Sequence, residues 1–184
     1  MKREEINIRD PFVLTRNGQY YLYGTRGATC WGPADGFDVY VSRDLENWDG
    51  PFECFHNDGT FWADRNYWAP EVHEYHGKLY MLASFKREDL CRGTAILTAD
   101  NPLGPFVPHS DGRVTPPIGS ALTGRFTSAR TTNRISSLRT SGCRSATAKS
   151  APCPSPMTFP APSANRSCSS MRPKRNGRGW CITC

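Results

Sequence analysis

Short runs of aromatic and β-branched residues alternate with polar residues throughout the first 111 positions of the chain. The runs at 20–23, 39–41 and 79–82 are bounded by turn-forming pairs such as Asn-Gly, His-Gly, Asp-Gly and Gly-Pro. Runs of this composition are typical of β-strands, and Gly and Pro pairs mark the turns between them. Apolar residues do not recur here with the spacing of a helix. The pattern therefore predicts an all-β fold.

The same region also repeats itself along the chain. A shift of 59 residues aligns two pairs of segments, and the shift is shorter for two further pairs. The aligned segments are 10–14 with 69–73, 18–23 with 77–82, 38–42 with 94–98, and 50–52 with 104–106. Each unit is predicted to contain four short strands. Units of about 40–50 residues with four strands are typical of propeller blades, so the sequence predicts a β-propeller with at least two blades.

Charge is distributed unevenly, although the whole chain has a formal net charge of +6. All 17 Asp and Glu residues lie at or before Asp111, together with 11 of the 23 Lys and Arg residues, so this part has a net charge of −6. The rest of the chain holds 12 basic residues and no acidic one. Globular domains mix both signs of charge. We therefore predict a partial propeller, blades one and two, over residues 1–117, and an irregular or disordered basic tail over 118–184.

Other sequence signals concern location and metal binding. No apolar run approaches the roughly 20 residues of a membrane span, and no apolar segment follows the charged N-terminal residues as in a secretory signal. The sequence therefore predicts a cytoplasmic protein without a membrane partner. The eight Cys residues lack the spacing of a disulfide framework or a zinc site. Cys181 and Cys184 form a CxxC without a second pair or a His partner, so no metal site is expected.

Four motifs follow one another along the chain: IRDPF at 8–12, GQYYLYGT at 18–25, SRDLENW at 42–48 and YWAPEV at 67–72. In this order they resemble glycoside hydrolase family 43, and the resemblance covers the region from about residue 5 to residue 117. The resemblance implies a five-bladed β-propeller that cleaves β-xylosides, α-L-arabinofuranosides or arabinans with inversion. The protein is thus expected to be a glycosidase that hydrolyses O-glycosyl bonds of plant pentose glycosides. The choices between xylose and arabinose, and between exo and endo cleavage, stay open.

The resemblance also implies roles for two carboxylates. Asp10, in the Arg-Asp-Pro motif, corresponds to the general base of the family. Glu71, after Trp-Ala-Pro, corresponds to the residue that tunes the pKa of the general acid and orients substrate, although many members have the shorter Asp there. An inverting glycosidase also needs a protonated acid, about 6.5–9.5 Å from the base. In the family that acid is a Glu of the third blade, and Glu88 is the last Glu in this chain. We therefore expect weak or no activity.

Further candidates surround these two motifs. The candidate substrate-binding residues are Arg9, Trp62, Tyr67 and Trp68. Packing between blades explains each aromatic residue equally well, and Arg9 can instead form a structural ion pair. Asp10 before Pro also fits a turn cap, and Glu71 also fits a solvated carboxylate at a strand end. No cofactor is expected. Some family members hold an ion in the channel, but the resemblance assigns no ligands for it here.

One hypothesis explains both the missing third blade and the composition of the tail. If the tail is translated one nucleotide out of register from the codons of Pro116 and Pro117, the neighbouring frame can encode a further blade. With suitable codons it reads as turn, strand, turn and strand, and it contains a His-Glu-Trp motif where the family has its general acid. We therefore predict a frameshifted tail. The sequence does not distinguish a sequencing error from a pseudogene.

Two other functions compete with hydrolysis. The first is a non-catalytic carbohydrate-binding remnant. The second is nucleic-acid binding through the basic tail, since phosphate contacts need little beyond positive charge. The basic residues of the tail are scattered singly and aromatic residues are sparse, which argues against the second function. The expected partner is therefore an oligosaccharide or an aryl pentoside and not nucleic acid, and the oligomeric state is left open.

Overall fold

The computed structural model describes residues 1–115, 120–129 and 132–141, the last two ranges by their backbone. Its elements are a 3₁₀ turn η1 (Arg3–Glu5) and the strands β1 (Ile8–Arg16), β2 (Gln19–Arg26), β3 (Gly36–Ser42), β4 (Trp48–His56), β5 (Arg65–Tyr75), β6 (Lys78–Arg87), β7 (Leu90–Ala99), β8 (Val107–Pro108), β9 (Ser120–Ala129) and β10 (Thr132–Ser141). The described part of the chain is thus mostly strand with almost no helix, as the sequence predicts.

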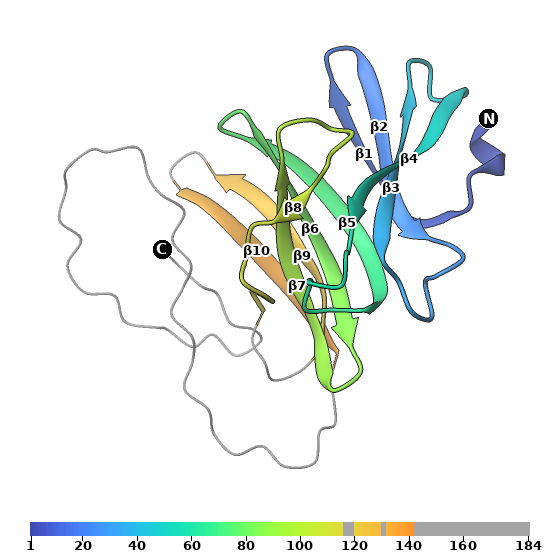
Figure 1. Ribbon diagram of the computed structural model, residues 1–184. Coiled ribbons are helices and arrows are strands. Elements are labelled where there is room, and N and C mark those ends of the chain that lie inside the picture. The colour runs from blue at the N-terminus through green and yellow to red at the C-terminus, as the bar shows by residue number, and fades with distance from the viewer. Residues whose placement is uncertain (116–119, 130–131, 142–184) are drawn as a thin grey trace.

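Strands β1–β4 form one four-stranded antiparallel sheet and β5–β8 form a second one, each in the order of the chain. The two sheets stand side by side in Figure 1, with their first strands β1 and β5 in contact. An ion pair from Arg16 to Glu74, at 3.2 Å, joins these two strands. The structure therefore confirms the two predicted four-stranded units and their blade-like arrangement.

The first hairpin of each blade has the same tight turn. Asn17 and Gly18 have φ angles of 52° and 72°, and His76 and Gly77 have φ angles of 49° and 78°. Two successive residues with positive φ are required by the two-residue turn that matches the twist of antiparallel strands. The Asn-Gly and His-Gly pairs of the sequence thus fix the register of β1 with β2 and of β5 with β6.

An aromatic core joins the two blades. Phe37 and Phe55 of the first blade contact Tyr67 and Phe85 of the second, with ring centroids 5.8–6.2 Å apart. All four side chains are at most 2% exposed. Each large aromatic ring removes considerable apolar surface from water, and edge-on ring pairs add to that stabilisation. The two blades therefore form one packed unit and hold their first strands in a fixed relation.

A hairpin of β9 and β10 lies on the far side of the second blade, where β9 contacts β6 and β7 (Figure 1). The sequence predicts no strand after residue 117, so this expectation is corrected for 120–129 and 132–141. Strand pairing uses backbone groups, and Thr, which favours strands, recurs in both segments. A search for alternating apolar residues misses such strands. Residues 142–184, with most of the predicted irregular tail, lie outside the described residues, and the frameshift hypothesis stays a prediction.

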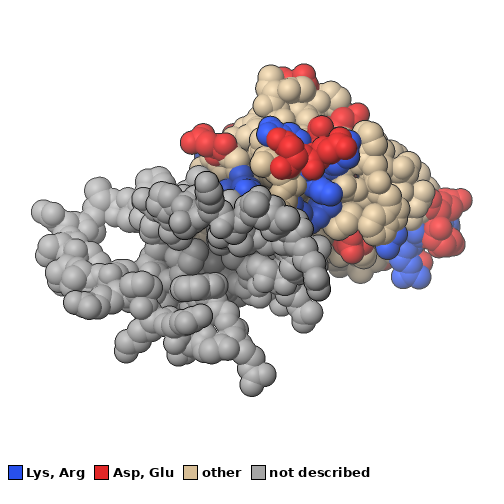
Figure 2. All heavy atoms as spheres, turned by 90° about the horizontal axis from the view of Figure 1, so that it is seen from below, with Lys and Arg blue, Asp and Glu red and all other residues tan. Residues whose placement is uncertain are grey.

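The surface of the described part mixes both signs of charge. In Figure 2, acidic and basic side chains lie next to one another over the face that is shown. One cluster joins Arg26 to Asp35, Asp38 and Glu53 through contacts of 2.6–2.8 Å. No helix among the described residues is long and apolar enough to cross a membrane.

Candidate active site

The Arg-Asp-Pro and Trp-Ala-Pro motifs form equivalent irregularities in β1 and β5. The register of β1 with β2 shifts between Arg9 and Phe12, and the register of β5 with β6 shifts between Trp68 and Glu71. Asp10 and Ala69 lie within these shifts, and each has a φ angle of 49°. A bulge of this kind turns a side chain away from the regular alternation of the strand, and bulges are frequent beside active sites. The bulge of β1 presents Asp10 as an exposed carboxylate.

A single hydroxyl group connects the two motifs. Thr25, on β2, donates a hydrogen bond from its hydroxyl to Oδ2 of Asp10 at 3.1 Å. The hydroxyl oxygen of Thr25 in turn accepts the backbone N–H of Ala69, the residue two before Glu71, at 2.9 Å. Thr25 is 1% exposed, so its hydroxyl is buried, whereas Asp10 at the other end of the first bond is exposed. The structure thus brings the first-blade motif and the start of the second-blade motif together.

Glu71 lies just after the second bulge, on β5. Its side chain is 21% exposed, and Oε2 is 3.4 Å from Nε2 of His73. The His73 ring in turn packs edge-on against Phe12 of β1, with centroids 5.2 Å apart. Glu71 therefore belongs to the contact between the first strands of the two blades, where the sequence predicts a site carboxylate.

Arg9 and Trp68 belong to a stack of charged and aromatic side chains beside Asp10. The guanidinium of Arg9 lies 5.2 Å from the ring centroid of Trp31, which is 71% exposed. Trp31 meets Trp68 edge-on at 5.2 Å, and the guanidinium of Arg92 lies 3.4 Å from the ring centroid of Trp68. Trp68 also donates its indole N–H to the backbone oxygen of Cys30. The loop between β2 and β3 is thereby fixed against the second blade.

The other two predicted sugar-binding residues point elsewhere. Tyr67 is 2% exposed, donates to Ala63 O at 2.6 Å and accepts from Asn57 at 2.9 Å. It belongs to the core between the blades. Packing between blades is the alternative to sugar binding that the sequence analysis gives for this residue. Trp62 is half-buried and packs against Phe61 and Phe85. Its indole N–H has no hydrogen-bond partner among the described residues.

Sequence reasoning missed Thr25, Trp31 and Arg92. Thr25 could have been found from the repeat, because the shift of 59 residues places it opposite another hydroxyl residue, Ser84. Arg92 is 4% exposed, and it donates to Asn66 O at 2.7 Å and to Ser84 Oγ at 3.2 Å. Burial lowers the pKa of Arg92 to about 10, so the guanidinium still carries its charge at neutral pH. No pattern in the sequence distinguishes Trp31 from the other tryptophans.

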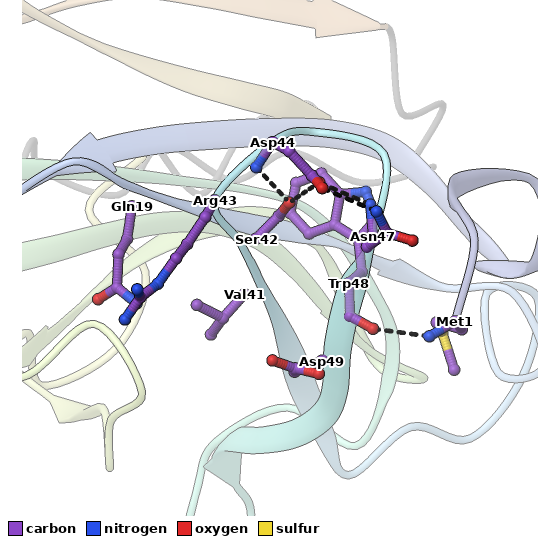
Figure 3. A pocket seen from close by; sticks show the side chains of 9 residues that line it. All are labelled: Met1, Gln19, Val41, Ser42, Arg43, Asp44, Asn47, Trp48 and Asp49. Carbon is purple, nitrogen blue, oxygen red and sulfur yellow. Dashed lines mark hydrogen bonds between the residues drawn. The ribbon is translucent and has the colours of Figure 1, made fainter.

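A polar hollow of about 430 Å³ lies apart from the Arg-Asp-Pro and Trp-Ala-Pro motifs, at the turn between β3 and β4 (Figure 3). It is lined by Met1, Gln19, Val41, Ser42, Arg43, Asp44, Asn47, Trp48 and Asp49. Asp44 accepts hydrogen bonds from Ser42, Glu46 and Asn47, and the N-terminal amine donates to Trp48 O at 2.8 Å. Trp48 itself is 4% exposed and packs with Leu22 and Tyr40. These contacts are those of a structured turn.

The described residues offer no ligand set for a channel ion of the kind that some family members hold. No three His, Cys, Asp or Glu side chains in this part of the chain are grouped so that they could bind a metal ion. No step of the chemistry is therefore assigned to a metal.

Comparison with known proteins points in one direction. The sequence profile described as glycosyl hydrolases family 43 matches residues 5–120. The structure of an endo-arabinase from Bacteroides thetaiotaomicron VPI-5482 has 31% sequence identity and a TM-score of 0.64, over 71% of this chain and 44% of that one. A thermostable family-43 glycoside hydrolase has 28% identity and a TM-score of 0.60, over 68% of this chain and 39% of that one.

A third solved structure agrees in fold. An endo-1,4-beta-xylanase from Bacteroides thetaiotaomicron VPI-5482 has 24% identity and a TM-score of 0.56, over 68% of this chain and 40% of that one. This chain thus spans less than half the length of each of these three proteins. No curated protein sequence matches it.

Proposed function

Because the chain belongs to the glycosyl hydrolases of family 43, we propose that it is a glycosidase that hydrolyses O-glycosyl bonds of plant pentose glycosides with inversion. The observation that supports this most directly is the exposed Asp10 carboxylate, which the β1 bulge presents and the Thr25 hydroxyl holds. The endo-arabinase among the similar structures supports a pentose-containing substrate. Xylosides and arabinosides are the two classes to be compared.

Asp10 is the proposed general base. Its carboxylate is exposed, so water reaches it, and the bond from Thr25 occupies Oδ2 and leaves Oδ1 available. In an inverting reaction the base removes a proton from water while the water oxygen attacks the anomeric carbon and the glycosidic bond breaks. Removal of that proton contributes about 10²–10⁴-fold to the rate in typical enzymes.

Glu71 is proposed to orient the substrate and to raise the pKa of a general acid through its negative charge. Its place beside the contact of β1 and β5 supports this role. The acid itself has no candidate among the residues after Glu88, because the chain contains no further Glu and only Asp89, Asp100 and Asp111 as carboxylates. We therefore propose that the chain activates water but protonates the leaving oxygen poorly.

This division of labour predicts a dependence on the leaving group. A dinitrophenolate departs without protonation, whereas a sugar or methanol oxygen needs the acid. We expect the purified chain to hydrolyse dinitrophenyl xyloside or arabinoside. Methyl pentosides and oligosaccharides should be hydrolysed more slowly, partly because their leaving groups are intrinsically poorer. Beyond that intrinsic difference, the missing acid should slow them by a further factor of about 10²–10⁴. Initial rates with both substrate classes test this.

Two variants complete the test. Asp10→Asn should reduce hydrolysis of the dinitrophenyl pentoside by about 10²–10⁴-fold, and Asp35→Asn, at an exposed carboxylate outside the motifs, is the matched control. Efficient cleavage of oligosaccharides would show that the chain does supply an acid. Absence of turnover even with the dinitrophenyl pentosides, which need no acid, would show that Asp10 does not activate water in this chain and would contradict the proposal.

A carbohydrate-binding remnant is the second candidate, and the exposed Trp31 beside Arg9 favours it. An exposed indole face can pack against the apolar face of a sugar ring. This function predicts that xylo- or arabino-oligosaccharides raise the melting temperature without turnover, and that Trp31→Ala abolishes the increase.

A further inference from the structure

We propose that Thr25 is a positioning residue that orients the Asp10 carboxylate toward the attacking water and couples it to the second blade. The inference rests on the proposed role of Asp10 as the general base. Nothing in the motifs assigns a role to Thr25. It is the last residue of the GQYYLYGT run, and from the sequence alone it could be any buried residue of a strand. Its hydrogen bonds are what distinguish it.

The direction of the bond to Asp10 follows from what a hydroxyl group can do. A Thr hydroxyl has one proton to donate and lone pairs that accept. The backbone N–H of Ala69 can only donate, and it meets Oγ1 of Thr25 at 2.9 Å. The hydroxyl proton is thus free for the acceptor on the other side, which is Oδ2 of Asp10 at 3.1 Å. Two bonds with fixed direction define the rotation of the hydroxyl.

Thr25 is well suited to hold another side chain. It is 1% exposed, and its branched Cβ restricts χ1. Asp10, by contrast, is exposed and lies at a bulge. The bond from Thr25 is the one hydrogen bond of its carboxylate within the described residues. Orientation of a reacting group is worth a large part of a catalytic rate, so this bond is expected to matter for turnover.

The second blade contains the same arrangement without a carboxylate. Ser84 pairs with Trp68 across β5 and β6 as Thr25 pairs with Arg9 across β1 and β2. Opposite Ser84 the bulge carries Ala69, and the Ser84 oxygen accepts from Arg92 at 3.2 Å instead. A buried hydroxyl beside the bulge is therefore common to both blades, and that of Thr25 donates to a carboxylate. Ser84 provides a matched control position within the chain.

The first experiment observes the Asp10 side chain itself. Three-bond couplings from the Asp10 carboxyl carbon to the backbone, measured by NMR on the full chain, report its χ1 angle. We expect a single χ1 rotamer in the wild type and in Thr25→Ser, averaged rotamers in Thr25→Val, and no change in Ser84→Ala. Averaged couplings in the wild type would overturn the proposal, whether or not Thr25→Val folds.

The second experiment measures the consequence for the reaction. With a dinitrophenyl pentoside, Thr25→Val should lower kcat by about 10- to 100-fold with KM nearly unchanged, and Thr25→Ser should restore most of kcat. A Thr25→Val variant with altered couplings but normal kcat would overturn the positioning role. If the wild type has no turnover, the proposed hydrolase function fails, while the couplings still decide whether Thr25 fixes Asp10.

Discussion

The carboxylate of Asp44 shows how a single exposed side chain can be tied to its surroundings. It accepts the backbone N–H groups of Asn47 and Glu46 and the side-chain amide of Asn47, at 2.7–2.9 Å. These bonds, the one from the Asn47 backbone first, hold the pKa of Asp44 well below its usual range. They favour the ionised form, so Asp44 stabilises the turn only while it carries its charge.

The pH dependence follows from the sign of that shift. A carboxylate whose pKa is lowered by folding contributes stability above its unfolded pKa of about 3.9, and loses it as the pH falls further. We predict that the melting temperature of the wild type falls more steeply between pH 5 and pH 2 than that of Asp44→Asn. Calorimetry across this range measures the difference. Asp100→Asn, which alters an 86% exposed carboxylate, is the control, and equal slopes for Asp44→Asn and wild type would contradict the prediction.

At the site, sequence and structure differ because motifs identify residues and not their contacts. Asp10 and Glu71 follow from the motifs, although their catalytic roles stay predictions. Thr25 could not be recognised from its own strand, because its importance comes from Ala69, which is 44 residues away. Tyr67 is adjacent in sequence to Trp68 and yet faces the core, since successive residues of a strand point to opposite sides.

The tight turn between β5 and β6 depends on a glycine with a positive φ angle. Gly77 has a φ angle of 78°, and a Cβ atom placed there would meet nothing within 4 Å. Only the backbone conformation opposes a side chain at this position. We predict that Gly77→Ala lowers the free energy of unfolding by about 1–2 kcal/mol, which is the cost of an L-residue in the left-handed region. Urea denaturation measures this.

Gly32 supplies the matched control for that substitution. It also has open space around it, but it lacks a positive φ angle. Gly32→Ala should therefore be neutral or stabilising by up to about 1 kcal/mol, through the smaller entropy of the unfolded chain. If both variants lose the same stability, the turn geometry is not the reason for the glycine at 77.

The strands of the two blades could be predicted because three signals agree on them: alternating residues, turn pairs and the repeat. The hairpin of β9 and β10 could not, since its segments lack an apolar alternation and have no counterpart in the repeat. The packing of β9 against β6 and β7 joins segments that are distant in the sequence. Such tertiary dependence is invisible in a local pattern.

For the whole molecule, the two blades and their shared core account for the base side of the proposed reaction but not for the acid side. Blades bury their faces against their neighbours, and family 43 places its acid in the next blade according to the resemblance. The predicted frameshift at the codons of Pro116 and Pro117 connects these two facts. One nucleotide at that point would change both the packing of the second blade and the chemistry of the site.

Restoring the neighbouring frame therefore makes the final prediction. The restored chain should unfold cooperatively at a higher temperature, because the second blade gains a complete neighbour. It should also cleave methyl pentosides or oligosaccharides about 10²–10⁴-fold faster than the present chain, since a general acid contributes that much. Its rate with a dinitrophenyl pentoside should change far less, because that leaving group needs no proton.

Changing the Glu of the His-Glu-Trp motif to Gln should remove the gain with unactivated substrates alone. A restored gene with early stop codons, or equal gains with both substrate classes, would refute the frameshift account.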